Sequence, residues 1–202
     1  MYRLLYDQVI KWIPEKSRVL DLGTGDGAFL KRLIETRQVR GEGVEKNGDL
    51  AARCIERGLV VHQGDILEGL DQYGLNAFDY VLLLGTFQEL GDPEQILREA
   101  FRVGQRVVIS YSNFAHWRIR LQLLFTGHSP VTRSLPSPWY RTPNLHFFSI
   151  LDFQEFCQTI GIREIEHAYF NQRGCVRWRP NLRGELGLSL LEANDLEPSR
   201  ED

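Results

Sequence analysis

A glycine-rich run carries the strongest chemical signal in the sequence. Asp21 ends an apolar segment, and glycines follow at positions 23, 25 and 27 before a helical pattern begins. Glycines between a strand and a helix let the backbone approach a ligand closely and direct the first helix amides toward it. The dinucleotide fingerprint is Gly-x-Gly-x-x-Gly, whereas this run is Gly-x-Gly-x-Gly, preceded by an acid. Because that acid would repel a pyrophosphate, the turn favours a ligand with a cationic end.

Two further acids follow the next two predicted strands. Glu45 ends the second predicted strand, 41–45, where a carboxylate can accept both hydrogen bonds of a ribose diol. Asp65 follows the run 59–63, where it could meet an adenine amino group. Parallel strands end at one edge of a sheet, which is where open α/β folds bind ligands. The glycines alone would fit an ordinary tight turn, but with the three acids they predict a nucleoside site.

These residues belong to an alternation of predicted strands and helices. An amphipathic helix is expected within 1–13, and helices at 28–34, 49–57 and from Pro93 to Gly104 separate the strands that follow. Such an alternation predicts a parallel, doubly wound sheet with right-handed crossovers. A further helix is expected from Asp152, as its N-cap, to Gly161. The strands are expected at 18–22, 41–45, 59–63, 78–84, 106–111, 163–170 and 185–191.

The composition describes one ordinary globular domain. The 202 residues are 43% hydrophobic and 25% charged, with a net charge of −3, which argues against a protein built for nucleic acid. The three cysteines are too widely spaced for a disulfide framework or a zinc site, and His116, His128 and His146 lack zinc spacing, so no metal is expected. No apolar run approaches a membrane span, and we expect a cytoplasmic protein. The composition leaves the oligomeric state open.

The domain is expected to cover residues 1–191, with an irregular insertion at about 112–151 and a charged, disordered tail over 192–202. From Ala100 to Leu151 the chain contains arginines but no aspartate or glutamate. Arginine and large aromatics concentrate in protein interfaces, so one interpretation is a docking surface for an acidic or amphipathic partner. The alternatives are an insertion whose aromatics pack on the sheet, and contact with an anionic bilayer, which the short 117–125 run makes the weakest. The candidate partner residues are Trp117, Arg118, Arg120, Trp139, Tyr140 and Arg141.

The runs VLDLGTGDG, GVE, GD and FDYVLL resemble the class I S-adenosylmethionine-dependent methyltransferases over residues 17–111. The resemblance implies a Rossmann-like α/β fold with a mostly parallel seven-stranded sheet, a C-terminal antiparallel hairpin and an insertion after the fifth strand. It also implies S-adenosylmethionine or S-adenosylhomocysteine as the cofactor. The residues that would bind it are Asp21, Gly23, Thr24, Gly25, Gly27, Glu45, Lys46, Gly64, Asp65, Ile66 and Leu84.

A second resemblance extends over nearly the whole chain. The runs NFAHWRIRLQLL, LPSPWYRTPNLHFFSILDFQEFC and RPNLRGELGLSLLE are similar to the MetW family of methionine-biosynthesis proteins, although Thr24 stands where that family would lead us to expect cysteine. The resemblance implies a subunit that binds and activates a homoserine O-acyltransferase. The alternative is an active methyltransferase on a small molecule or protein. A third hypothesis joins the two: S-adenosylmethionine, a downstream product of methionine, would report the status of the pathway by binding to this pocket.

Methyl transfer needs a positioned nucleophile and, for a hydroxyl or amine acceptor, a base. The candidates follow the fourth and fifth strands: Glu89 as a base, and Tyr111. Glu89 also fits an ordinary carboxylate at a helix start, which is the more frequent role. The sequence therefore leaves open whether the protein is an enzyme.

Overall fold

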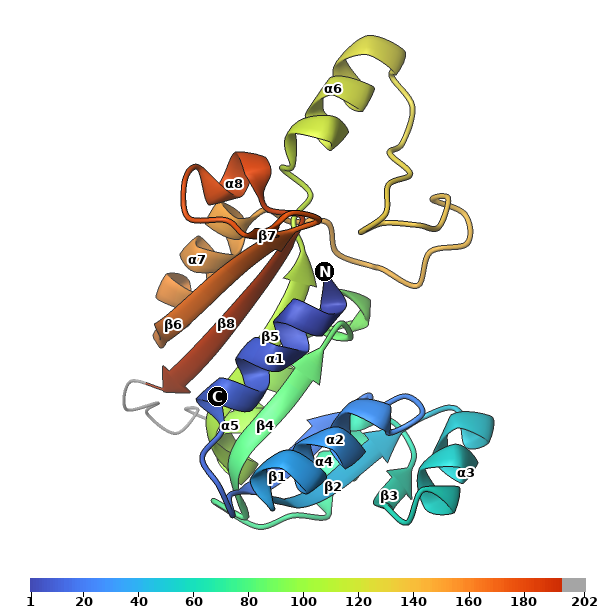
Figure 1. The fold of residues 1–202 in the computed structure, drawn as a ribbon, viewed down its shortest axis with the longest axis vertical. Helices are drawn as coiled ribbons and strands as arrows, with labels where there is room; N and C mark the ends of the chain where they lie inside the picture. Colours follow the sequence, from blue (N-terminus) through green and yellow to red (C-terminus); the bar gives the residue numbers. More distant parts are fainter. Residues whose placement is uncertain (194–202) are drawn as a thin grey trace, which may run out of the picture.

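The computed structural model describes residues 1–193, which form one mixed eight-stranded sheet with helices on both faces (Figure 1). The strand order is β3-β2-β1-β4-β5-β8-β6-β7. The first five strands pair in parallel, and β8 lies antiparallel between β5 and β6. The strands are β1 (Arg18–Leu22), β2 (Arg40–Glu45), β3 (Val60–Gln63), β4 (Phe78–Leu84), β5 (Gly104–Ser112), β6 (Ile162–Asn171), β7 (Gly174–Cys175) and β8 (Leu186–Ala193).

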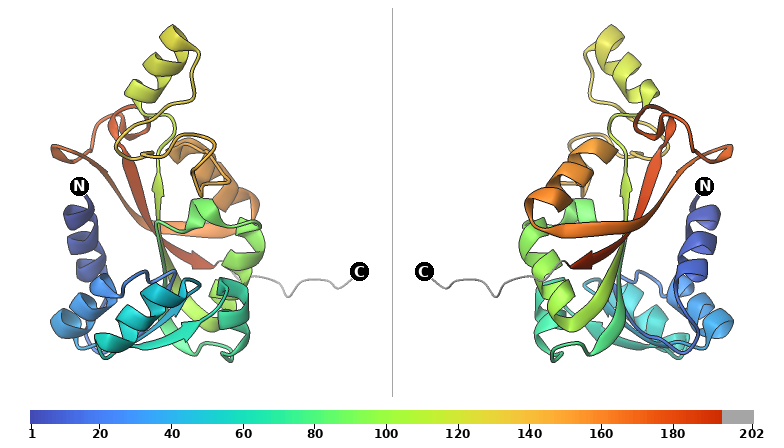
Figure 2. Two further views of the ribbon diagram at one scale, coloured as in Figure 1. Left: turned by 90° about the vertical axis from the view of Figure 1, so that its right-hand side faces the viewer. Right: turned by 90° about the vertical axis from the view of Figure 1, so that its left-hand side faces the viewer.

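Helices cover both faces of the sheet (Figure 2). Their apolar side chains pack against it in two buried clusters, one on each face. Successive strand residues point to opposite faces, so Leu82 packs with α1 and α2 while Leu83 packs with α4, α5 and α7. No helix in residues 1–193 has the length and hydropathy to cross a bilayer. The helices are α1 (Tyr2–Trp12), α2 (Ala28–Arg37), α3 (Gly48–Glu56), α4 (Ile66–Asp71), α5 (Pro93–Val103), α6 (Trp117–Thr126), α7 (Ile150–Thr159) and α8 (Pro180–Arg183), with the 3-10 helix η1 (Phe87–Glu89).

The predicted fold class is confirmed, with differences at the C-terminal side. The final strands form the expected antiparallel pair, but the short β7 pairs with β6 and makes the sheet eight-stranded. The prediction of Asp152 as the N-cap of α7 is wrong, because Ser149 caps that helix and Asp152 completes the capping box from the first turn. Strand β8 continues to Ala193, two residues into the expected tail. Residues 194–202 of that tail lie outside the described residues.

The insertion after β5 contains a helix that the sequence analysis did not predict. An irregular segment is expected here because prolines at positions 130, 136, 138 and 143 disfavour long regular elements, yet all four follow α6, which has ten residues. Gly127 ends the helix in the left-handed conformation, at φ 66°. Ile119 is the one buried residue of α6, which projects away from the sheet (Figure 1).

Candidate functional site

The glycine turn after β1 has one closely packed part and one open part. Gly23, Gly25 and Gly27 all have positive φ, between 62° and 75°, which favours glycine. A Cβ at Gly23 would lie 2.2 Å from Cγ2 of Thr86, so this glycine is required by packing against the loop after β4. A Cβ at Gly25 would meet no atom within 4 Å. The backbone is therefore accessible at Gly25, where a ligand could approach it.

Asp21 is the penultimate residue of β1 and lies next to this turn. Its side chain is only 3% exposed, and its Oδ2 accepts a hydrogen bond of 2.8 Å from the Thr24 hydroxyl. Burial, reinforced by the nearby Glu45 carboxylate, raises the pKa of Asp21 to about 6 in spite of the Thr24 hydrogen bond. A cation placed beside Asp21 would stabilise its charged form.

Glu45, at the end of β2, is joined to the same turn. Its Oε2 accepts from the Gly25 amide and its Oε1 from the Asn47 amide, each at 2.8 Å. The carboxylate is 9% exposed. Each carboxylate oxygen can accept two hydrogen bonds, so both oxygens retain acceptor capacity while the backbone fixes their direction.

Asp65 lies at the next strand end and caps a helix. Its Oδ1 accepts from the Leu67 amide as the N-cap of α4, and Lys46 lies 3.3 Å from Oδ2. The Gly64 amide donates to the Glu45 carbonyl, which holds the ends of β2 and β3 together. Ile66 begins α4, so its amide has no acceptor within the helix. The structure thus brings the predicted cofactor residues of three strands to one edge of the sheet, and Leu84 ends the neighbouring β4.

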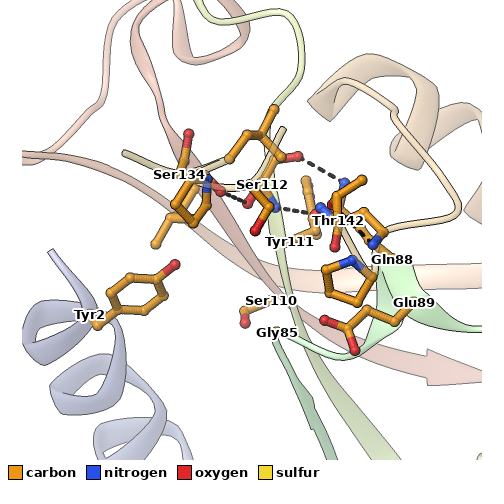
Figure 3. A pocket seen from close by; sticks show the side chains of 15 residues that line it. Tyr2, Gly85, Gln88, Glu89, Ser110, Tyr111, Ser112, Ser134 and Thr142 are labelled. Atoms are coloured by element: carbon orange, nitrogen blue, oxygen red, sulfur yellow. Dashed lines mark hydrogen bonds between the residues drawn. The ribbon is translucent and has the colours of Figure 1, made fainter. Parts of the chain in front are cut away.

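A cavity of about 190 Å³ lies beyond the ends of β4 and β5 (Figure 3). Tyr2 of α1 and Glu89 of η1 reach it from opposite sides. Burial, followed by the charge of Glu45, raises the pKa of Glu89. Glu89 is the one carboxylate of the lining, which is otherwise rich in hydroxyl groups, including those of Ser110 and Thr142.

Tyr111, the other catalytic candidate, is a core residue. It is 2% exposed, and its ring lies 4.5 Å from the ring of Phe153 between centroids. Its hydroxyl is buried without a hydrogen-bond partner among the described residues, and burial raises its pKa well above the usual value. A Cβ at Gly187 would come within 2.4 Å of the ring. This placement favours a packing role for Tyr111.

Gln88 connects the insertion to the sheet edge that carries the glycine turn, called here the cofactor edge. Sequence spacing alone could not predict this role. Its side chain accepts from the Ser112 amide at 2.7 Å and donates to the carbonyls of Ser112 and His146, each at 3.2 Å. Its own carbonyl accepts from the amides of Leu145 and His146. Gln88 follows Thr86, whose side chain contacts Gly23, so one segment touches both the glycine turn and the insertion.

The predicted partner residues form two exposed groups of aromatic and arginine side chains. On α6 the Arg118 guanidinium lies 5.3 Å from the Trp117 ring, and in the loop beyond Arg141 lies 5.8 Å from the Tyr140 ring. Trp139 packs edge-on against Tyr140. The sixth candidate, Arg120, donates to the carbonyl of residue 115. The sequence analysis did not single out Leu124 and Phe125, which are among the most exposed apolar side chains.

A glycine turn and the acids at the ends of β1 and β2, in a sheet of this order, define a protein with the class I S-adenosylmethionine-dependent methyltransferase fold. Residues 3–191 match the family model of the methionine biosynthesis protein MetW, and the chain belongs to the MetW family.

Two solved structures are similar to the chain over most of its length. One is an S-adenosylmethionine-dependent methyltransferase of Thermotoga maritima, a possible histamine N-methyltransferase, with a TM-score of 0.69, 19% identity and coverage of 96% of this chain and 89% of that one. The other is a magnesium protoporphyrin IX methyltransferase of Synechocystis with bound S-adenosylhomocysteine, with a TM-score of 0.68, 11% identity and coverage of 96% and 84%. At these identities the likeness concerns the fold.

A curated relative joins a MetW part to a second protein. It is the bifunctional methionine biosynthesis protein MetXA/MetW of Rhodopirellula baltica, 29% identical over 174 residues. The match covers 82% of this chain and 28% of that relative. The present chain thus spans little more than a quarter of the length of that bifunctional protein.

Proposed function

We propose that this protein binds S-adenosylmethionine or S-adenosylhomocysteine and acts in methionine biosynthesis as the partner and activator of a homoserine O-acyltransferase. The observation that carries the proposal is the bifunctional relative, in which a MetW part and a MetXA part occur in one chain. Joining two proteins in one chain raises their effective concentration for each other, which is useful only if they act together.

The residues at the sheet edge fit the proposed cofactor. The open backbone at Gly25 would admit the amino-acid end of the cofactor, and the Asp21 carboxylate would pair with its ammonium group. Glu45 retains acceptor capacity for a ribose diol, and the Ile66 amide could donate to an adenine nitrogen. When bound, S-adenosylmethionine supplies an electrophilic methyl group on a sulfonium.

Calorimetry of the purified protein with S-adenosylmethionine and S-adenosylhomocysteine tests the cofactor proposal. We expect saturable binding that Asp21→Ala weakens at least tenfold, because the ammonium loses its partner. Binding of equal strength in Asp21→Ala would overturn the assignment of this edge.

A separate experiment tests the partner proposal. The protein is mixed with the homoserine O-acyltransferase of the same organism, and we expect co-elution in gel filtration and a higher rate of acyl transfer. Two separate peaks with an unchanged rate would contradict the proposal. Stimulation that is identical with and without the cofactor would remove the idea that the cofactor regulates the partner.

The cavity beside Glu89 favours a second candidate function, that of an active methyltransferase. Glu89 is positioned to take a proton from a hydroxyl or amine acceptor, because it lines a cavity next to the cofactor edge. The test is transfer of label from methyl-labelled S-adenosylmethionine to any component of a cell extract. Label that appears with the wild type and is lost with Asp21→Ala and Glu89→Gln supports the enzyme, and no labelled acceptor contradicts it.

A further inference from the structure

A second polar cavity, of about 410 Å³, lies at the base of α6 and has no lining residue in common with the cavity beside Glu89. Three separate parts of the chain form it. Arg118 comes from the start of α6, Arg173 from the turn between β6 and β7, Arg183 from the end of α8, and Glu185 from the residue before β8. These parts include the runs NFAHWRIR and RPNLRGE, on which the resemblance to the MetW family rests, and the proposed function uses neither Arg183 nor Glu185.

Buried hydrogen bonds hold the parts of this cavity in place. Asn113 is fully buried, and its Nδ2 donates to the carbonyls of Gly184 at 2.8 Å and Asn181 at 2.9 Å. The Asn113 amide donates to the Glu185 carbonyl, and the Glu185 amide donates to the Phe170 carbonyl. The backbone that carries Glu185 is therefore fixed before any ligand arrives, which lowers the entropy lost on binding.

Glu185 is a buried residue whose carboxylate has an unpartnered oxygen among the described residues. The residue is 7% exposed and lines the cavity, and its Oε2 is buried without a hydrogen-bond partner. Within residues 1–193 no lysine, arginine or histidine nitrogen lies within 4.0 Å of this carboxylate. A buried carboxylate with an unpartnered oxygen is unfavourable, and a cationic group of a ligand in the adjoining cavity would stabilise its charge.

The remaining charged groups of the lining are positive. Arg118, Arg173 and Arg183 are exposed and offer the planar donor groups that bind carboxylates in pairs. One cavity therefore presents an unsatisfied anion and several cations. The volume is in the range of small-molecule sites, roughly 300–1,000 Å³.

We propose that this cavity is a binding site for a zwitterionic α-amino acid, with the ligand ammonium group at Glu185 and the ligand carboxylate at the arginines. A ligand with only a positive charge would leave the arginines unused and would meet their repulsion. A ligand with only a negative charge would leave Glu185 unpaired. The proposal uses no residue of the cofactor edge, and its test needs no acyltransferase, although Arg118 is also one of the candidate partner residues.

The test is thermal stability of the purified chain with each of the twenty common amino acids and homoserine, followed by calorimetry of the best ligand. We expect at least one amino acid to raise Tm in a saturable way. Its descarboxy amine and its desamino acid, which each lack one charge, should bind at least tenfold more weakly. The proposal is overturned if no amino acid raises Tm, or if either single-charge analogue binds as well as the parent.

Variants locate the binding. Glu185→Gln keeps the shape of the side chain and removes an unpartnered buried charge, so we expect an equal or higher Tm without ligand and at least tenfold weaker ligand binding. Arg118→Gln should also weaken ligand binding, because it removes a cation of the lining. Arg133→Gln changes an exposed arginine of the insertion outside the cavity, so it is the matched control and should bind the ligand normally. Asp21→Ala should bind the amino acid with unchanged affinity, which separates this site from the cofactor edge. Unchanged affinity in Glu185→Gln, or loss in Asp21→Ala, would refute the location.

Discussion

At the scale of single residues, the cofactor edge combines rigid support with open access. Glu45 is held by two backbone amides and Asp21 by one hydroxyl, whereas Gly25 faces free space. The sequence was sufficient to predict that these three residues meet at one edge of the sheet, because strand ends and glycine turns are local signals, and their role in binding a cofactor stays a prediction. It could not predict Glu185, because the cavity around that residue depends on segments that are far apart in the chain.

The first prediction concerns Asp21 and pH. The pKa of Asp21 is raised from 3.8 to about 6 by folding, so between these values the folded protein binds more protons than the unfolded one. The contribution of Asp21 to the free energy of unfolding is therefore lost as pH rises from about 4 to about 6, by at most about 3 kcal/mol. Urea denaturation at pH 4.5 and 7 should show this loss in the wild type and not in Asp21→Asn. Parallel pH profiles of the two proteins would contradict the prediction.

The second prediction compares two glycines of the same turn. Gly23→Ala places a Cβ against Thr86 and should lower the free energy of unfolding by about 3 kcal/mol, whereas Gly25→Ala adds only backbone strain, about 1 kcal/mol. Thr86→Ser removes the clashing methyl group and should recover part of the stability of Gly23→Ala. Chemical denaturation measures the free energy of unfolding of the wild type, Gly23→Ala, Gly25→Ala and the double variant Gly23→Ala with Thr86→Ser. Equal destabilisation by the two alanines would be inconsistent with the packing described for Gly23.

At the scale of elements, the local patterns predicted the regular part of the fold and failed in the insertion. The run 78–84 is apolar apart from Asp79, and the predicted strand has the bounds of β4. The ten-residue α6 buries only Ile119, so its sequence lacks the apolar stripe from which a helix is predicted. The bonds of Gln88 join residues far apart in the sequence, and no local pattern predicts them.

The third prediction concerns Gln88 as the connection between η1 and the insertion. Gln88→Ala removes three side-chain hydrogen bonds and should destabilise the protein by about 2–3 kcal/mol. Hydrogen exchange should accelerate at the Ser112 amide and across residues 134–148. Gln158→Ala, on the exposed side of α7, is the control and should leave exchange unchanged. Unaltered exchange in Gln88→Ala would mean that other contacts hold the insertion.

At the scale of the whole molecule, α6 projects away from the sheet and from the helices that cover its two faces (Figure 1). It exposes apolar side chains to solvent. Leu124 and Phe125 are 74% and 76% exposed near its end. The surrounding insertion carries arginines and no acids, so an apolar partner surface with an acidic rim would complement it. Under the proposed function, we therefore propose α6 and the insertion around it as the docking surface for the acyltransferase.

The fourth prediction follows from this shape and rests on the proposed function. Leu124→Gln combined with Phe125→Gln should change the free energy of unfolding by less than about 0.5 kcal/mol, since both side chains are exposed. The same double variant should weaken acyltransferase binding at least tenfold, measured by calorimetry of the two purified proteins. Leu75→Gln, an equally exposed leucine on another part of the surface, is the control. A double variant that binds the acyltransferase normally would exclude α6 as the docking helix.

The place of β8 in the sheet has a consequence for synthesis. It is the last strand along the described chain, yet it lies inside the sheet between β5 and β6. While the polypeptide is still being translated, β5 has no neighbour on one side, and β6 lacks the strand that joins it to the rest. Unpaired strand edges promote aggregation, so the nascent chain is most prone to aggregate before residues 186–193 leave the ribosome. A chaperone that binds nascent chains in that interval should therefore raise the yield of soluble protein.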